Sequence, residues 1–346
     1  MCTKDRTGDI LRITLGVSIG LMLSKYLTLS FNFQIPTVAM MVVLGMDKFN
    51  LKVFIKSNSW LIGAATLGLF ITEIFRNNHL VLSVFTFGFI FSVFFFNHKN
   101  PSGMRSAVLG YSFTTIFATY SDKNVESMVT DIYLVTIIGG LLGWGLLLLF
   151  PKKPHEMVGI KKVKKEREEI HKNIGNTLLI SIMLFLIWMS FMIFDIRGAF
   201  FAYATLAGIY GNLSLETIHK LSPLNIGIHV TGCTLAIIFS FFMDGRGIAP
   251  PIFLLGLMCL FYPLGYMGFY GNTPKKRAFS MGLIRAIILP IALYLTPNGD
   301  IVQQASTRAI QITVMVIGSM VITNLLLKIE EGKKDGKNTS NNRKNK

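Results

Sequence analysis

Residues 151–172, PKKPHEMVGIKKVKKEREEIHK, form the longest strongly polar run before the C-terminal tail. This run divides the 346 residues nearly in half, and a series of apolar segments lies on each side of it. Because the later segments repeat features of the earlier ones, the sequence predicts one membrane-embedded unit present twice. We expect a first repeat at 1–150, a basic cytoplasmic linker at 151–172, a second repeat at 173–327 and a disordered basic tail at 328–346.

The composition indicates an all-α polytopic membrane protein. Hydrophobic residues make up 51% of the chain and charged residues 15%, whereas about a quarter of the residues of a soluble protein are charged. The apolar residues occur in blocks rather than in helical stripes. The net charge of +16 would suit a nucleic-acid partner, but the basic residues lie in short loops between apolar blocks. That placement is typical of membrane topology, so we expect a lipid bilayer and no nucleic acid.

Twelve apolar segments approach or reach the roughly 20 residues that a membrane-spanning helix needs. They cover residues 11–29, 34–46, 57–75, 79–97, 105–120, 130–150, 174–194, 198–211, 223–243, 248–268, 278–296 and 304–327. If the N-terminus is cytoplasmic, 27 of the 34 Lys and Arg residues fall on the cytoplasmic side, 4 on the other side and 3 within spans, when Arg12 and Arg105 at the cytoplasmic ends of their spans are counted as cytoplasmic. This asymmetry predicts twelve spans with both termini in the cytoplasm.

The internal repeat is visible at two fixed offsets. At an offset of 164 residues, the first-half residues Leu51, Lys56, Ile62, Gly63 and Gly68 recur as Leu215, Lys220, Ile226, Gly227 and Gly232. At an offset of 172 residues, Asn100, Arg105 and Gly110 recur as Asn272, Arg277 and Gly282. Six spans in each half mean that both halves enter the membrane from the same side. The two six-helix repeats are therefore predicted to be parallel, related by an axis along the membrane normal.

The second span of each half is unusually short. Residues 34–46 begin close to Pro36, a residue that suits the first turn of a helix. Residues 198–211 start with Gly198, end with glycine and include Gly208. Short or Gly/Pro-interrupted segments at corresponding places in two repeats indicate a transporter binding region. The alternative is a tilted helix, covered by protein, that binds no ligand.

The first half also resembles a known family. Its first span, LRITLGVSIGLMLSKYL (residues 11–27), begins with the positive residue Arg12, and WLIGAATLG follows at residues 60–68. The sixth span, DIYLVTIIGGLLGWGLLLLFP (residues 131–151), contains a D-x-x-x-x-T-x-x-G pattern formed by Asp131, Thr136 and Gly139. These features resemble the fusaric acid resistance protein family, which includes the aromatic acid exporters.

The resemblance implies a multi-pass exporter in the bacterial inner membrane. It implies proton-driven efflux of aromatic carboxylic acids or related toxic compounds, and a periplasmic membrane-fusion protein as partner. Many family members carry a large soluble cytoplasmic domain between the halves. Here about 22 residues join them, so the chain resembles the smaller members that lack that domain.

Ionisable residues within the spans are the candidate functional residues, because a charge in the bilayer centre is costly. Arg285 could hold a carboxylate through paired hydrogen bonds, and a structural pairing is the alternative. His229 could carry a proton, or it could be a buried, hydrogen-bonded histidine. Glu73 and Lys25, near the outer ends of their spans, could pair with each other or take part in proton entry.

Two further arginines complete the predicted anion path. Arg308 lies near the start of the last span, where it could line an anion exit or extend toward the outer surface. Arg197, just before the short eighth span, could attract anions at the outer mouth, or it could be a solvated loop charge.

Enzymes are not indicated, because the chain contains no GxxxxGK[ST], no HExxH and no paired-cysteine metal motif. No catalytic residue, cofactor or metal is therefore expected. A passive organic-anion channel and a non-transporting partner within an envelope complex remain the alternatives to an exporter. The sequence leaves open which organic acid is carried, and whether one chain or a homo-oligomer forms the pathway.

Overall fold

The computed structural model describes residues 6–27, 29, 31–96, 101–120, 125–151, 174–194, 200–210, 215–243, 249–295 and 300–344. These residues form twelve α-helices and no strand. In chain order the helices are α1 (Thr7–Tyr26), α2 (Gln34–Gly45), α3 (Leu51–Phe75), α4 (His79–Phe96), α5 (Pro101–Tyr120), α6 (Val125–Leu149), α7 (Ile174–Phe194), α8 (Phe200–Tyr210), α9 (Leu215–Phe242), α10 (Pro250–Tyr270), α11 (Pro274–Tyr294) and α12 (Ile301–Lys344).

Each predicted apolar segment corresponds to one of these helices. The predicted and observed bounds differ in where a helix begins or ends. Helix α3 begins six residues before the predicted span because the Asn50 side chain caps it, accepting hydrogen bonds from the backbone nitrogens of Lys52 (3.0 Å) and Val53 (3.3 Å). Thr273 caps α11 in the same way, through a bond from the nitrogen of Lys276 (3.2 Å). These two helices therefore begin in polar loops, before the apolar residues that hydropathy detects.

The C-terminal tail differs from the prediction. The sequence predicts a disordered tail from residue 328, whereas α12 continues as helix to Lys344. This part of the tail contains no proline and several Lys and Glu residues, which favour a helix, although Gly332, Gly336 and the asparagines have low helix propensity. The predicted linker lies outside the described residues, apart from Pro151.

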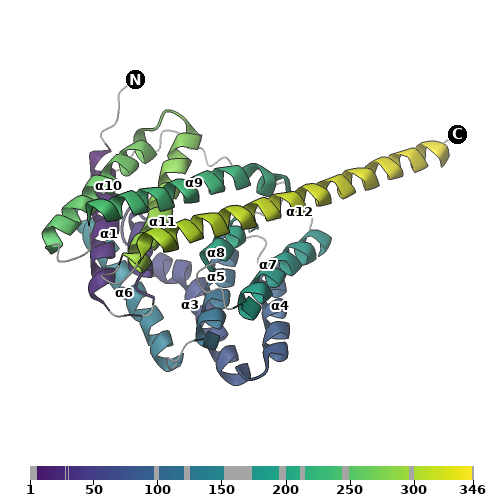
Figure 1. The fold of residues 1–346 in the computed structure, drawn as a ribbon, viewed down its shortest axis with the longest axis horizontal. Coiled ribbons are helices and arrows are strands. Elements are labelled where there is room, and N and C mark those ends of the chain that lie inside the picture. Colours follow the sequence, from purple (N-terminus) through teal and green to yellow (C-terminus); the bar gives the residue numbers. More distant parts are fainter. Residues whose placement is uncertain are drawn as a thin grey trace.

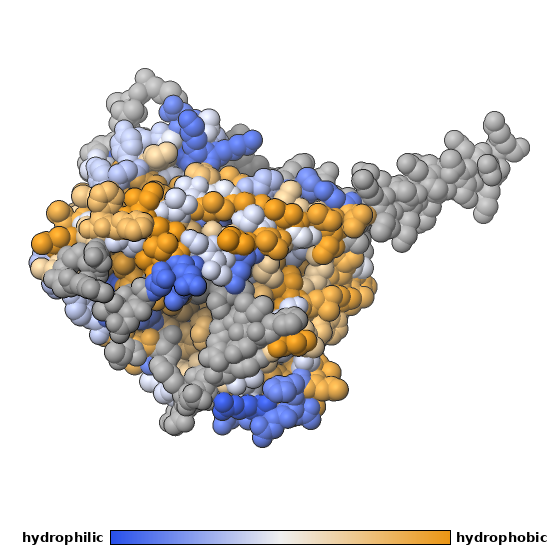
Figure 2. Space-filling model, viewed as in Figure 1, coloured by the Kyte–Doolittle hydropathy of each residue, from blue (hydrophilic) through white to orange (hydrophobic). Residues whose placement is uncertain are grey.

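Seven of the described helices are long and apolar enough to cross a membrane. They are α1, α3, α4, residues 127–149 of α6, residues 221–242 of α9, α10 and residues 301–325 of α12. Helix α2 and residues 177–193 of α7 are shorter apolar helices. Apolar side chains cover much of the middle of the face visible in Figure 2, where one cluster of hydrophilic side chains interrupts them, and further hydrophilic side chains lie toward its upper and lower edges. The described part of the chain is therefore all-helical, and its apolar helices indicate a multi-pass membrane protein.

The first helix of each predicted half packs against the other half. Helix α1 contacts α10 and α11, while α7 contacts α4 and α5 (Figure 1). Within the halves, α3 packs along α5, α2 against α1 and α6, and α9 against α11 and α12. The side chains follow this pattern, because α1 contributes Ile13, Val17 and Leu21 to the hydrophobic cluster of α9–α11. The fully buried Trp188 of α7 donates a hydrogen bond to Thr115 of α5 (3.1 Å).

Glycines allow two of these helix pairs to approach closely. A Cβ atom on Gly110 of α5 would lie 2.5 Å from the Leu61 carbonyl oxygen of α3, and one on Gly68 would lie 2.9 Å from the Tyr111 carbonyl oxygen. In the second half, a Cβ on Gly232 of α9 would lie 2.6 Å from the Ala286 Cβ of α11. Small residues at such crossings let membrane helices pack backbone to backbone.

Replacing Gly110 with alanine tests this close approach. We expect Gly110→Ala to lower the free energy of unfolding by about 1–3 kcal/mol, because the added methyl group overpacks the α3–α5 crossing. Gly88→Ala is the matched control, since a Cβ there meets no atom within 4 Å and alanine favours the helix. Thermal unfolding of the purified protein in detergent measures the stability of both variants. Equal changes in stability of the same sign for Gly110→Ala and Gly88→Ala would contradict the close packing.

Candidate functional site

His229 and Arg308 lie close together between α9 and α12. Arg308 is 2% exposed and interacts electrostatically with His229 and with Cys233. The Nε2 atom of His229 lies 3.0 Å from the Thr205 hydroxyl of α8. Its Nδ1 atom is buried and has no hydrogen-bond partner among the described residues. One ring nitrogen of His229 is thus held by α8, and the other is buried without a described partner.

Arg285 lies near the middle of α11, which packs against both α9 and α12. Its side chain is exposed, and it forms no hydrogen bond or ion pair with a described residue. The structure therefore places Arg285, His229 and Arg308 on three helices that contact one another. A guanidinium at this depth, with its donors unused, is chemically suited to bind an anion.

Lys25 and Glu73 do not pair with each other in the described part of the chain. The Lys25 ammonium lies 5.6 Å from the centre of the Phe253 ring at the start of α10, a distance suited to a cation–π contact. Glu73 is exposed near the end of α3. The sequence places both residues near the outer ends of their predicted spans, which suggested a pair. In the structure, Lys25 of α1 lies against α10 instead of α3.

The two short helices are both present. Helix α2 has 12 residues and α8 has 11. Pro36 is buried in the first turn of α2, packed so closely on α1 that a Cβ on Gly20 would lie 2.6 Å from the Pro36 Cα. Gly208 lies within α8, whereas Gly198 and Arg197 lie outside the described residues.

A cavity of about 220 Å³ runs beside the short helix α2. Residues of α3, α5 and α6 complete it, together with Leu289 of α11. Its described lining is uncharged and consists of Phe33, Gln34, Thr37, Val38, Met41, Ser57, Asn58, Leu61, Ala65, Ser106, Leu109, Gly110, Phe113, Thr114, Ile132 and Leu289. Sequence analysis singled out α2 but missed these residues. The only signal available was the set of small and polar residues along one face of α3.

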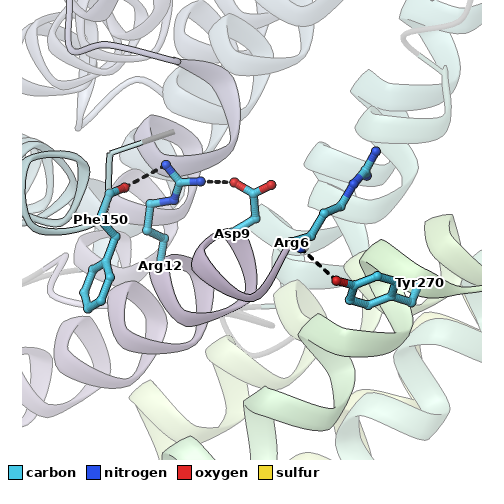
Figure 3. Close-up of polar contacts among 5 residues, drawn as sticks. All are labelled: Arg6, Asp9, Arg12, Phe150 and Tyr270. Atoms are coloured by element: carbon cyan, nitrogen blue, oxygen red, sulfur yellow. Dashed lines mark hydrogen bonds and ion pairs between the residues drawn. The ribbon is translucent and has the colours of Figure 1, made fainter. Parts of the chain in front are cut away.

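A buried arginine ties the start of α1 to the end of α6. Arg12, 2% exposed, donates from Nη1 to the Phe150 carbonyl oxygen (2.9 Å) and forms an ion pair with Asp9 through Nη2 (Figure 3). Nearby, the backbone nitrogen of Arg6 donates to the hydroxyl of Tyr270 at the end of α10 (2.7 Å). The start of α1 and the ends of α6 and α10 therefore lie at one end of the bundle, an arrangement compatible with the predicted topology.

We expect Arg12→Met to destabilise the protein by about 3 kcal/mol, because it removes one partner of a buried ion pair and leaves Asp9 and the Phe150 carbonyl without their donor. Arg6→Met makes the same change in charge, but it keeps the bond to Tyr270, which uses the backbone nitrogen. Its expected effect is below about 0.5 kcal/mol. Thermal unfolding in detergent compares the two variants, and an Arg12→Met protein as stable as Arg6→Met would show that the ion pair is dispensable.

Comparisons with known proteins cover the first half of the chain only. A family model described as a protein of unknown function, DUF2955, matches residues 9–142. No curated protein and no solved structure gives a significant match to the chain. The matched region runs from the start of α1 into α6 and includes most of the residues that line the cavity.

Proposed function

We propose that this protein is a secondary transporter that exports small organic anions, aromatic carboxylates in particular, by coupling to protons. The observation that carries the proposal is the placement of Arg285, His229 and Arg308 on three helices in mutual contact. Ionisable residues are costly inside a membrane and commonly mark the path of a substrate or a proton. The resemblance to the fusaric acid resistance family supports the class of substrate.

The repeat offsets relate His229 and Arg285 to residues that line the cavity of the first half. Ala65 of α3 and Phe113 of α5 both line the cavity of the first half. At the offsets of 164 and 172 residues, their counterparts are His229 of α9 and Arg285 of α11. The α3–α5 and α9–α11 pairs cross at glycines that follow the same offsets. We infer that the face which lines a neutral cavity in the first half becomes a cationic surface in the second.

The chemistry of these groups suits an organic anion. A guanidinium binds a carboxylate through two parallel hydrogen bonds, and the attraction is stronger in a low-dielectric interior than in water. Arg285 is proposed to hold the anion, and Arg308 adds positive potential beside His229. A proton on His229 and an anion at Arg285 would change the charge on the same packed helices. Coupled transport of the proton and the anion requires such a shared change.

The remaining predicted residues have supporting roles in this proposal. Lys25 and Arg197 would attract anions at the outer end of the path, and Glu73 is the alternative proton carrier. Pro36, Gly198 and Gly208 would belong to the binding region of the short helices. From the resemblance we further propose the bacterial inner membrane as the location and a periplasmic membrane-fusion protein as partner. From the charge asymmetry of the loops we propose that both termini are cytoplasmic.

Transport by Arg285→Gln tests the anion site. Purified protein in proteoliposomes, given radiolabelled aromatic and aliphatic carboxylates and an imposed pH gradient, is expected to accumulate at least one aromatic acid. Loss of charge-assisted hydrogen bonds should raise the KM of Arg285→Gln about tenfold or more. Arg277→Gln, an exposed residue in the first turn of the same helix, should transport like the native protein. Equal KM values for the two variants would remove Arg285 from the site.

His229→Gln separates proton coupling from anion binding. Glutamine can still bond to Thr205 but does not titrate, so we expect pH-driven accumulation to disappear while exchange of labelled for unlabelled anion continues. Accumulation unchanged by this substitution would exclude His229 as proton carrier and direct attention to Glu73→Gln. Native flux that follows the membrane potential and ignores the pH gradient would favour a passive channel.

A further inference from the structure

We propose that the cavity beside α2 is a separate binding site for a neutral, mostly apolar ring compound that carries one hydrogen-bonding group. The site lies in the first half and differs in chemistry from the cationic surface of α9, α11 and α12. Sequence analysis did not identify it, because its lining comes from five helices and the loop before α2.

The size of the cavity suits a compound of one or two rings. Its volume of about 220 Å³ exceeds the roughly 150 Å³ of an engineered apolar cavity that binds benzene. Two aromatic side chains form part of the wall. The rings of Phe33 and Phe113 meet edge to face, with their centres 5.5 Å apart and their planes at 75°. A flat, apolar ligand would extend this aromatic packing.

Gln34 provides the polar contact. Its Oε1 atom is buried and has no hydrogen-bond partner among the described residues, a situation that costs free energy until a donor arrives. Several other polar groups in the wall donate hydrogen bonds to backbone carbonyls. The Thr114 hydroxyl donates to the Gly110 carbonyl oxygen (2.9 Å), and the Asn58 amide donates to the Phe54 carbonyl oxygen (3.0 Å). Among the described wall residues, Gln34 is the one with a buried acceptor that has no partner, and we infer that the ligand's donor bonds to it.

The absence of charge in the described lining selects against ionised ligands. Moving a carboxylate from water into an apolar cavity without a cationic partner is costly, whereas a neutral ring loses little. Met41 and Ser57 both line the cavity and are exposed at the surface, so the opening lies between α2 and α3. A neutral apolar compound could enter there.

Binding of indole and indene tests the proposal, because the two compounds have nearly the same shape and only indole carries an N–H donor. Protein in lipid nanodiscs is equilibrated by dialysis against each radiolabelled compound, and uptake by empty nanodiscs is subtracted. We expect native protein to bind indole about five- to tenfold more tightly than indene, the effect of one hydrogen bond. Gln34→Leu should abolish this difference and leave indene binding unchanged.

Two further variants complete the design. Gln304→Leu replaces an exposed glutamine of α12, away from the cavity, and should retain the preference for indole. Thr37→Phe fills the cavity with a ring and should weaken both compounds at least tenfold. Equal affinities for indole and indene in native protein, a preference that survives Gln34→Leu, or unchanged binding to Thr37→Phe would each overturn the proposal. Anion transport is measured separately, so either proposal can fail without the other.

Discussion

Hydrocarbon offers no hydrogen-bond partner to a backbone amide, and this constraint governs the structure. Each spanning segment must satisfy its own backbone groups, which only a helix can do within a single segment. The helices then associate through close packing, since lipid tails are as apolar as their side chains. Close packing explains the glycines at the α3–α5 and α9–α11 crossings, because they bring backbones into contact where larger residues would separate them.

The same constraint explains how polar groups are distributed. Arg12 is buried, but the Phe150 carbonyl and Asp9 engage its guanidinium at one end of the bundle. Serine and threonine hydroxyls within the helices bond to carbonyl oxygens one turn earlier, as Thr72 does to Gly68 (2.8 Å). The hydroxyls of Thr14 and Ser18 in α1 are buried without a partner among the described residues, and so are atoms of His229 and Gln34. Arg285 forms no hydrogen bond or ion pair with a described residue. Arg285 belongs to the proposed anion path, His229 is the proposed proton carrier, and Gln34 lines the neutral cavity.

The sequence was sufficient to predict the helices, because apolar blocks and charged loops report local preferences. It could not predict contacts that depend on the rotation of each helix, such as the position of Lys25 over Phe253 instead of beside Glu73. The cavity was missed for the same reason, since Gln34 and Phe113 are far apart in the chain and meet only through packing. Arg285, His229 and Arg308 were found because a charge inside an apolar block is visible without any structure. That their three helices, α9, α11 and α12, pack against one another was visible only in the structure.

The account depends most on whether Arg285 faces an aqueous path or lipid. The most direct measurement is the reaction of Arg285→Cys, in a chain whose Cys2, Cys233 and Cys259 are replaced by serine, with a membrane-impermeant anionic thiol reagent. A protein that retains only Cys259, exposed on α10, is the lipid-facing comparison. The account predicts rapid modification at position 285 and little at Cys259. Modification of position 285 only by an apolar, membrane-permeant reagent would place this face of α11 in lipid and contradict the proposed anion path.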